Sequence, residues 1–140
     1  AVFKNSDKII YQKVKDNTVT LMQRDLVAQT ETPLVSGPFN PNIAYFDGLC
    51  LDNKDEYAYW SNAGGVYRCS LSSPKIEAVY TNCATVKYYN PVFQKIRPNE
   101  MYMACEFVTQ LSEFVLLHKF KAVEVNMQTS EKKVIEVFPE

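Results

Sequence analysis

The chain has 140 residues, 46% of them hydrophobic and 22% charged, and a net charge of −1 at pH 7. This composition is typical of a soluble globular protein and excludes a disordered chain. The near-zero charge leaves no general field that would attract nucleic acid. Apolar runs are short, as at residues 114–117, which excludes a membrane span. We expect one domain, residues 1–140, that binds no nucleic acid.

The first third of the chain predicts a hairpin followed by a third strand. Residues 9–14 are rich in β-formers and lead into the polar turn at residues 15–17. Apolar and threonine side chains then alternate over residues 18–21, as in a half-buried strand. A further strand is predicted at residues 33–35. Two prolines and a glycine in residues 37–42 indicate a connection to the next unit.

The middle of the chain predicts a second group of strands around a glycine turn. Residues 62–65, Asn-Ala-Gly-Gly, supply the glycines that a tight hairpin needs where φ is positive. Residues 52–56 are acidic and polar and predict a solvated turn. The strands of this group are predicted at residues 43–46, 49–51, 57–60, 66–71 and 76–80.

The last third of the chain predicts further strands, and the sequence signal is stronger for some of them than for others. Residues 86–96 are interrupted by Pro91, and residues 101–108 form another candidate strand. A helix competes with a strand over residues 109–121, where several apolar residues fall at helical spacing, but we favour a strand at 114–120. The last strands are predicted at residues 123–127, which alternate strictly, and 134–138.

Three stretches of the chain share one layout of strand, polar turn and strand. They are residues 18–35, 66–80 and 123–138. Such recurrence is typical of architectures built from similar sheets. We therefore predict an all-β fold of antiparallel sheets, made from about three hairpin units. The arrangement is either partial-propeller-like or a sandwich or barrel.

One segment, residues 43–80, resembles a blade of the YWTD-type six-bladed β-propellers. The resemblance rests on Gly-Leu-Cys-Leu-Asp at 48–52, Tyr-Trp-Ser-Asn at 59–62 and Gly-Val-Tyr-Arg-Cys-Ser-Leu at 65–71. Asn62 stands where the family has the aspartate that ties neighbouring blades. A closed ring needs at least about four blades, and three fit here. The resemblance implies that the chain pairs with another copy or is part of a longer protein.

Catalytic chemistry has little support in the sequence. His118 is the only histidine, and no serine or cysteine stands in a nucleophile motif that would use it as a base. The two glycines at 64–65 are not followed by the Lys-Ser/Thr pair of a phosphate-binding loop. We predict no catalytic residue and no cofactor, and we leave the question of an enzyme open with a lean toward none.

The acidic residues give only weak support for a metal site or for the paired carboxylates of a glycosidase. A cluster around the turn at 52–56 lacks the glycine and the terminal glutamate of an EF-hand loop, so we predict no metal site. Scattered carboxylates could pair as in a glycosidase only if the fold brought them together. The cluster comprises Asp47, Asp52, Asp55 and Glu56, and the scattered carboxylates are Asp25, Glu31, Glu106, Glu113 and Glu124.

The four cysteines, Cys50, Cys69, Cys83 and Cys105, contain no C-x-x-C motif. Both two disulfides and buried free thiols are compatible with this spacing. Residues 1–4 lack the start of a signal peptide, and a chain that opens on alanine is either a processed form or an excised piece. Location stays open, with a lean toward a secreted or extracellular one.

Aromatic residues are the clearest functional signal, with nine Tyr, eight Phe and one Trp. Tyrosine and tryptophan anchor interfaces because they bury large areas at small entropic cost. Residues 88–91, Tyr-Tyr-Asn-Pro, predict an exposed recognition loop. We predict a non-enzymatic module that recognises another protein or self-associates; the alternative is a β-barrel carrier of a small apolar ligand. The predicted binding residues are Tyr59, Trp60, Tyr67, Tyr88 and Tyr89.

Overall fold

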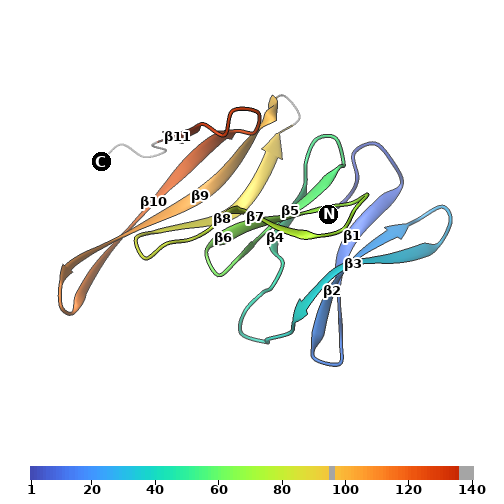
Figure 1. Cartoon of the computed structure of the whole chain (residues 1–140), viewed down its shortest axis with the longest axis horizontal. Helices are drawn as coiled ribbons and strands as arrows, with labels where there is room; N and C mark the ends of the chain where they lie inside the picture. Colours follow the sequence, from blue (N-terminus) through green and yellow to red (C-terminus); the bar gives the residue numbers. More distant parts are fainter. Residues whose placement is uncertain (95–96, 136–140) are drawn as a thin grey trace.

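The computed structural model describes residues 1–94 and 97–135. Within these residues, eleven strands form three antiparallel sheets, and no helix is present. The sheets follow one another in chain order along the long axis of the molecule (Figure 1). The predicted all-β class is therefore confirmed. The strands form separate sheets in a row, as the propeller-like alternative requires.

Each sheet is built from strands that are consecutive in the chain. The first sheet contains β1 (Lys8–Lys15), β2 (Thr18–Asp25) and β3 (Thr30–Pro38). The second sheet contains β4 (Asp47–Leu51), β5 (Tyr57–Asn62), β6 (Gly65–Ser70) and β7 (Ile76–Tyr80). The third sheet contains β8 (Val86–Gln94), β9 (Arg97–Ser112), β10 (Val115–Asn126) and β11 (Lys132–Ile135).

The three recurring units of the sequence correspond to the last two strands of each sheet. They are the β2–β3, β6–β7 and β10–β11 hairpins. The third unit was predicted to end at residue 138, and residues 136–138 lie outside the described residues. The preceding strands complete each sheet, so the repeating unit of the architecture is the sheet, and each predicted unit is the hairpin that ends it.

Two tight turns explain why the local sequence folds into hairpins. Asp16 and Asn17 join β1 to β2 with φ of 51° and 59°. Ala63 and Gly64 join β5 to β6 with φ of 48° and 81°. Two consecutive positive φ angles match the right-handed twist of paired strands, and asparagine, aspartate and glycine adopt them at the lowest cost.

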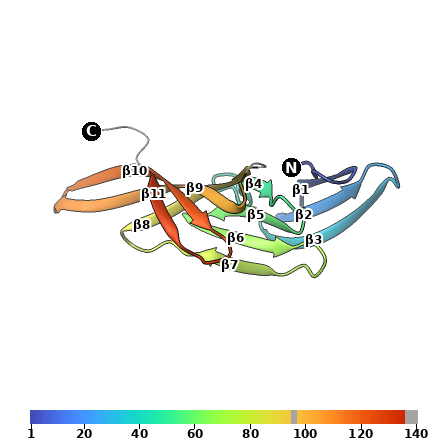
Figure 2. The ribbon, with the colours of Figure 1, turned by 90° about the horizontal axis from the view of Figure 1, so that it is seen from above.

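The second sheet is the central layer, and its two faces belong to two different cores. In β5, Ala58 and Trp60 pack toward the first sheet, in a core that contains Ile10 and Leu21. The intervening Tyr59 packs toward the third sheet. This is the period-2 alternation of a strand buried on both faces. Figure 2 shows the three sheets from above as successive parts of one elongated body.

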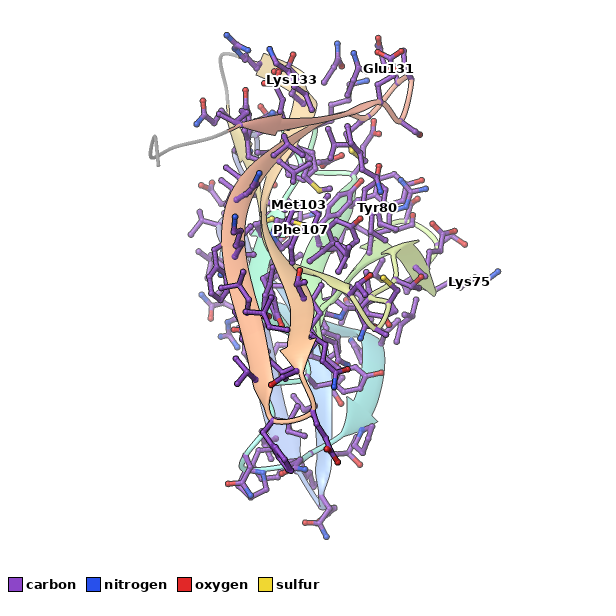
Figure 3. The ribbon with its side chains drawn as sticks, turned by 90° about the vertical axis from the view of Figure 1, so that its left-hand side faces the viewer. Lys75, Tyr80, Met103, Phe107, Glu131 and Lys133 are labelled. Carbon is purple, nitrogen blue, oxygen red and sulfur yellow. The ribbon has the colours of Figure 1, made fainter. Side chains whose placement is uncertain are left out.

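The core between the second and third sheets is rich in sulfur and β-branched side chains. Met103 and Cys105 of β9, with Val123 of β10, are 1–3% exposed. Tyr80 and Phe107 pack against them as partly buried residues. In Figure 3, Tyr80 and Met103 lie on the facing sides of the two sheets. One face of the third sheet is thus buried, which leaves the opposite face as its outer face.

The predicted strand at residues 43–46 is wrong. This segment makes one isolated bridge, between Asn40 and Ile43, and otherwise connects the first two sheets. Its apolar side chains pack in the core, and its backbone does not continue as a paired strand. Phe46 is 1% exposed and meets Trp60 edge-on at 4.9 Å, and the ring of Tyr45 lies directly over Gly37.

All four cysteines are free, so the disulfide alternative does not describe this structure. Cys69 and Cys105 are buried and Cys83 is exposed. The described residues contain no helix of the length and hydrophobicity that a membrane crossing would need.

Candidate interaction surface on the third sheet

The β9–β10 hairpin extends beyond the rest of its sheet. Among residues 1–94 and 97–135, β8 pairs with β9 as far as Phe107, and β11 pairs with β10 at 122–125. Residues 109–121 therefore form a two-stranded ribbon, here called the tip, whose strands pair only with each other among the described residues. The tip projects at the lower left of Figure 1. The predicted strand at 114–120 is confirmed in type, and β10 continues without a break to Asn126.

The tip exposes an unusual density of apolar side chains. Phe114, in the turn, is 90% exposed, and Phe120 is 68% exposed. Large apolar side chains that are exposed together often mark interaction sites in folded proteins. The exposed apolar residues of the tip are Leu111, Phe114, Val115, Leu116, Leu117 and Phe120.

A three-residue polar cluster lies on the outer face at the base of the tip. One oxygen of the Glu106 carboxylate, on β9, lies 2.5 Å from Nδ1 of His118 on β10. The other oxygen accepts a hydrogen bond of 3.0 Å from the hydroxyl of Tyr89 on β8. Glu106 is buried, with 8% exposure. The cluster therefore joins three adjacent strands through one carboxylate.

The electrostatics of this cluster follow from those bonds. The hydrogen bond from His118 is the main reason that the pKa of Glu106 lies below its ordinary value, and the bond from Tyr89 adds to the effect. Burial is the main reason that the pKa of Tyr89 is raised, and its hydrogen bond to the Glu106 carboxylate is the second reason. The arrangement stabilises a charged glutamate between two donors. Its hydrogen bonds connect β8, β9 and β10 and so brace the hairpin at its base.

The predicted recognition loop at residues 88–91 is wrong, because these residues belong to β8. Tyr88 pairs with Cys105 and points to the buried face, where Lys132 lies 4.9 Å from its ring centroid. Tyr89 is the next residue and points to the outer face. Pro91 lies in a bulge of this edge strand, a position where proline is tolerated.

The remaining predicted binding residues lie wholly or partly inside the molecule. Tyr59 and Trp60 are 2% and 1% exposed, one in each core. Tyr67 is half-buried, and its ring stacks with that of Trp60 at 6.5 Å. A partner could reach Tyr59 and Trp60 only if the sheets separated, and the binding role of all three stays a prediction. Tyr89 alone of the five predicted residues contributes to the outer face.

The acidic turn at residues 52–56 has structural partners. Asp52 accepts hydrogen bonds from the backbone N–H groups of Glu56 and Tyr57, which closes the turn before β5. Asp55 accepts from the backbone N–H groups of Lys4 and Asn5, which ties the N-terminal segment to the second sheet. Across residues 1–94 and 97–135, no cluster of three or more His, Cys, Asp or Glu side chains could hold a metal ion.

The YWTD-like segment coincides with the second sheet, and its substituted motif residue makes a link between sheets. Ser61, which stands for the threonine of the motif, is 2% exposed. Its Oγ accepts a 2.6 Å hydrogen bond from the backbone N–H of Asn90 in β8. Cys50 makes a second link, because its Sγ donates to the carbonyl of Pro91 at 2.9 Å.

Comparison with known proteins identifies the architecture but no family. No family model matches the chain, and no curated protein matches it. Among solved structures, an oligogalacturonate lyase in complex with manganese is similar over 95% of this chain and 38% of its own, with 18% identity and a TM-score of 0.69.

Two further solved structures are similar. A putative TolB from Agrobacterium tumefaciens is 10% identical over 95% of this chain and 46% of its own, with a TM-score of 0.64. The uncharacterized protein lmo1340 from Listeria monocytogenes EGD-e is 12% identical over 98% of this chain and 39% of its own, with a TM-score of 0.60. The lyase and the TolB-like protein are β-propeller-type folds, and this chain shares that type of fold. It spans less than half the length of each of these three structures.

Proposed function

We propose that this chain is a non-enzymatic interaction module that binds protein through the tip and the outer face of the third sheet. The observation that carries the proposal is the tip itself, a two-stranded ribbon whose residues 109–121 expose six large apolar side chains. Such a surface is costly to leave in water, and a partner that covers it gains the hydrophobic term.

The Tyr89–Glu106–His118 cluster supports this proposal as a brace for the tip. Its hydrogen bonds hold β8, β9 and β10 in register at the point where the sheet narrows to two strands. A ribbon held at its base loses less conformational freedom when a partner binds, and this raises affinity.

The arrangement of the sheets in a row determines which faces are available to a partner. We propose that residues 43–80 are one blade-like unit, as the YWTD resemblance implies, and that residues 1–140 are one domain. In a row of such sheets each face packs on a neighbour, so the end sheets carry the faces that are available to a partner.

Affinity capture with matched variants tests the proposal. A tagged chain is incubated with extract from cells that produce the protein, and the bound proteins, including untagged copies of the chain, are quantified by mass spectrometry. We expect a double variant, Phe114→Ser with Phe120→Ser, to lose specific partners by at least about tenfold, the effect of 1.4 kcal/mol.

The matched control is Val134→Ser, an apolar side chain on β11 that is 45% exposed but lies outside the tip. It should retain every partner. Equal recovery by the wild type and the tip variant would contradict the proposed interaction surface.

A further inference from the structure

A groove where the second and third sheets meet is lined by side chains of opposite charge. Its volume is about 390 Å³. Asp47, at the start of β4, lines it from the second sheet, and Lys87, in β8, lines it from the third. Ser61 and Gly64 are buried lining residues, so they form its floor. The groove therefore presents one anionic and one cationic side chain above a closed floor.

Hydrogen bonds between the two sheets fix the floor of this groove. The backbone N–H of Asn90 donates to Oγ of Ser61 at 2.6 Å, and the backbone N–H of Tyr88 donates to the carbonyl of Gly64 at 2.5 Å. A hydroxyl that accepts one bond keeps its O–H proton to donate, so Ser61 can still donate to a ligand. A groove that is held in this way loses little conformational freedom when a ligand binds.

Lys87 reaches the groove over the backbone of the β5–β6 turn. Its aliphatic stem lies against Gly64, where an added Cβ would be 2.9 Å from Cβ of Lys87 and 3.3 Å from its Cδ. Its cross-strand neighbour on β9 is Glu106, whose two oxygens are already hydrogen-bonded to His118 and Tyr89. A carboxylate that is satisfied by these donors leaves the ammonium of Lys87 to an acceptor in the groove.

A second, apolar groove continues from the first. Its volume is about 410 Å³, and Ile43 and Ala44 line both grooves. Val14, Phe39 and Ile43 line the second groove and are 42–55% exposed. Large apolar side chains that gather in a groove gain free energy when an apolar ligand group covers them. A charged groove is thus joined to an apolar groove at Ala44, whose side chain is a single methyl group.

We propose that the two grooves together bind a zwitterionic α-amino acid or dipeptide with a large apolar side chain. The ammonium of the ligand contacts Asp47, its carboxylate contacts Lys87, and its side chain crosses Ala44 into the apolar groove. A ligand with both charges is favoured, because a simple anion would be repelled by Asp47 and a simple cation by Lys87. This small-molecule site lies apart from the tip and adds to the proposed function.

A third groove, of about 430 Å³, also contains an acidic and a basic residue but suits this ligand less. Lys8 of the first sheet and Asp55 of the second-sheet turn line it. The carboxylate of Asp55 accepts the backbone N–H groups of Lys4 and Asn5. A ligand ammonium would have to compete with these bonds, whereas Asp47 is exposed on the wall of its groove.

Titration of the isotope-labelled full chain with L-phenylalanine and with the dipeptide Phe-Gly, followed by NMR, tests the site. We expect at least one of them to bind with a dissociation constant of about 1 mM or lower. N-acetyl-L-phenylalanine lacks the ammonium and L-phenylalaninamide lacks the carboxylate, so each should bind at least about fivefold more weakly than L-phenylalanine. L-Alanine, which cannot fill the apolar groove, should bind at least about tenfold more weakly.

Charge-removing variants assign each ligand group to its partner. Asp47→Asn should weaken L-phenylalanine at least about fivefold but leave N-acetyl-L-phenylalanine unchanged, because that probe has no ammonium to lose. Lys87→Gln should weaken L-phenylalanine equally but leave L-phenylalaninamide unchanged. The matched controls, Asp7→Asn and Lys75→Gln, remove the same charges from exposed residues outside both grooves. They should change no dissociation constant.

A substitution in the apolar groove tests where the ligand side chain lies. Phe39→Ser should weaken L-phenylalanine at least about fivefold and leave L-alanine within about twofold. Val134→Ser, which removes an exposed apolar side chain of β11, should leave both ligands unchanged. Far-UV circular dichroism verifies that each variant is folded.

The outcomes separate this site from the proposed function. Failure of both ligands to bind, equal binding of the N-acetyl or amide probe, or equal losses in the control variants would each overturn the site. A chain ending at Ile135 should bind L-phenylalanine like the full chain, and binding that appeared only after this truncation would also overturn it. Affinity capture that depends on Phe114 and Phe120 would in each case leave the proposed function standing.

Discussion

Individual cysteines of this protein occupy very different environments. Cys83 is exposed, and hydrogen bonds from the side chain and backbone of Thr85 lower the pKa of its thiol. Burial raises the pKa of Cys50 to about 12, and burial also raises the pKa of Cys105. The thiolate is the reactive form, so reactivity follows both exposure and pKa.

We therefore expect iodoacetamide to modify Cys83 at least about tenfold faster than the other three cysteines, because one pKa unit changes the thiolate fraction tenfold. Mass spectrometry of the native protein after short labelling measures this, and Cys83→Ser should remove the fast phase. Labelling in denaturant should reach all four cysteines. Fewer than four reactive thiols in denaturant without reductant would instead indicate a disulfide.

Glu106 makes stability depend on acid pH. Its pKa is lower in the folded chain than its ordinary value of 4.5, chiefly because His118 donates to it. The carboxylate thus contributes stability above pH 4.5, and this contribution is lost as pH falls through the folded pKa. We expect Glu106→Gln to be less stable at pH 7 and to lose less further stability on acidification. Urea unfolding from pH 7 to pH 3 measures both effects.

Glu113→Gln is the control for this experiment, because Glu113 is an exposed glutamate in the turn of the same hairpin. Its unfolding curves should follow the wild type at every pH. Parallel pH profiles for the wild type and Glu106→Gln would show that the cluster does not contribute to folding.

At the scale of elements, the hairpins were predictable because their signals are local. Alternation and turn residues identified β1–β2 and β5–β6, and the turns have the positive φ angles that those residues favour. The error at residues 88–91 has the same origin. Asn-Pro is a turn signal, but here it marks a bulge within β8, and only pairing with β9 distinguishes the two.

The tip was predictable as strand but not as a surface. Whether its apolar side chains are buried depends on how far β8 extends along the hairpin, and long-range pairing sets that extent. The Tyr89–Glu106–His118 cluster was missed for the same reason. Its members lie on three strands, and no local spacing relates them.

Substitutions at two adjacent residues of the β5–β6 turn are expected to have opposite effects on the stability of the fold. Gly64 has φ of 81°, and an added Cβ would lie 2.9 Å from Cβ of Lys87. Gly64→Ala should therefore lower stability by more than about 1 kcal/mol. Ala63 has φ of 48°, which glycine adopts without penalty, so Ala63→Gly should be neutral or slightly stabilising. Thermal unfolding compares them, and equal losses would contradict this account of the turn.

At the scale of the whole molecule, the second sheet connects two cores. Trp60 packs in the core shared with the first sheet, and Tyr59, its neighbour in sequence, packs in the core shared with the third. Any disturbance of one core therefore acts on a strand that also lines the other. This arrangement predicts one cooperative unit, as the single-domain proposal requires.

Substitutions in the two cores test this cooperativity. Leu21→Ala in the first core and Met103→Ala in the second should each lower the free energy of unfolding by about 2 to 5 kcal/mol. Trp60 is buried, so its emission should be blue-shifted in the folded state and should report the first core directly. We expect Met103→Ala to move the Trp60 transition as far as the transition seen by far-UV circular dichroism, although Met103 belongs to the other core. Val27→Ala, at a loop residue that is 75% exposed, should change neither by more than about 0.5 kcal/mol. If Met103→Ala left the Trp60 transition in place and split the circular dichroism curve, the two cores would unfold separately and the chain would be two units instead of one.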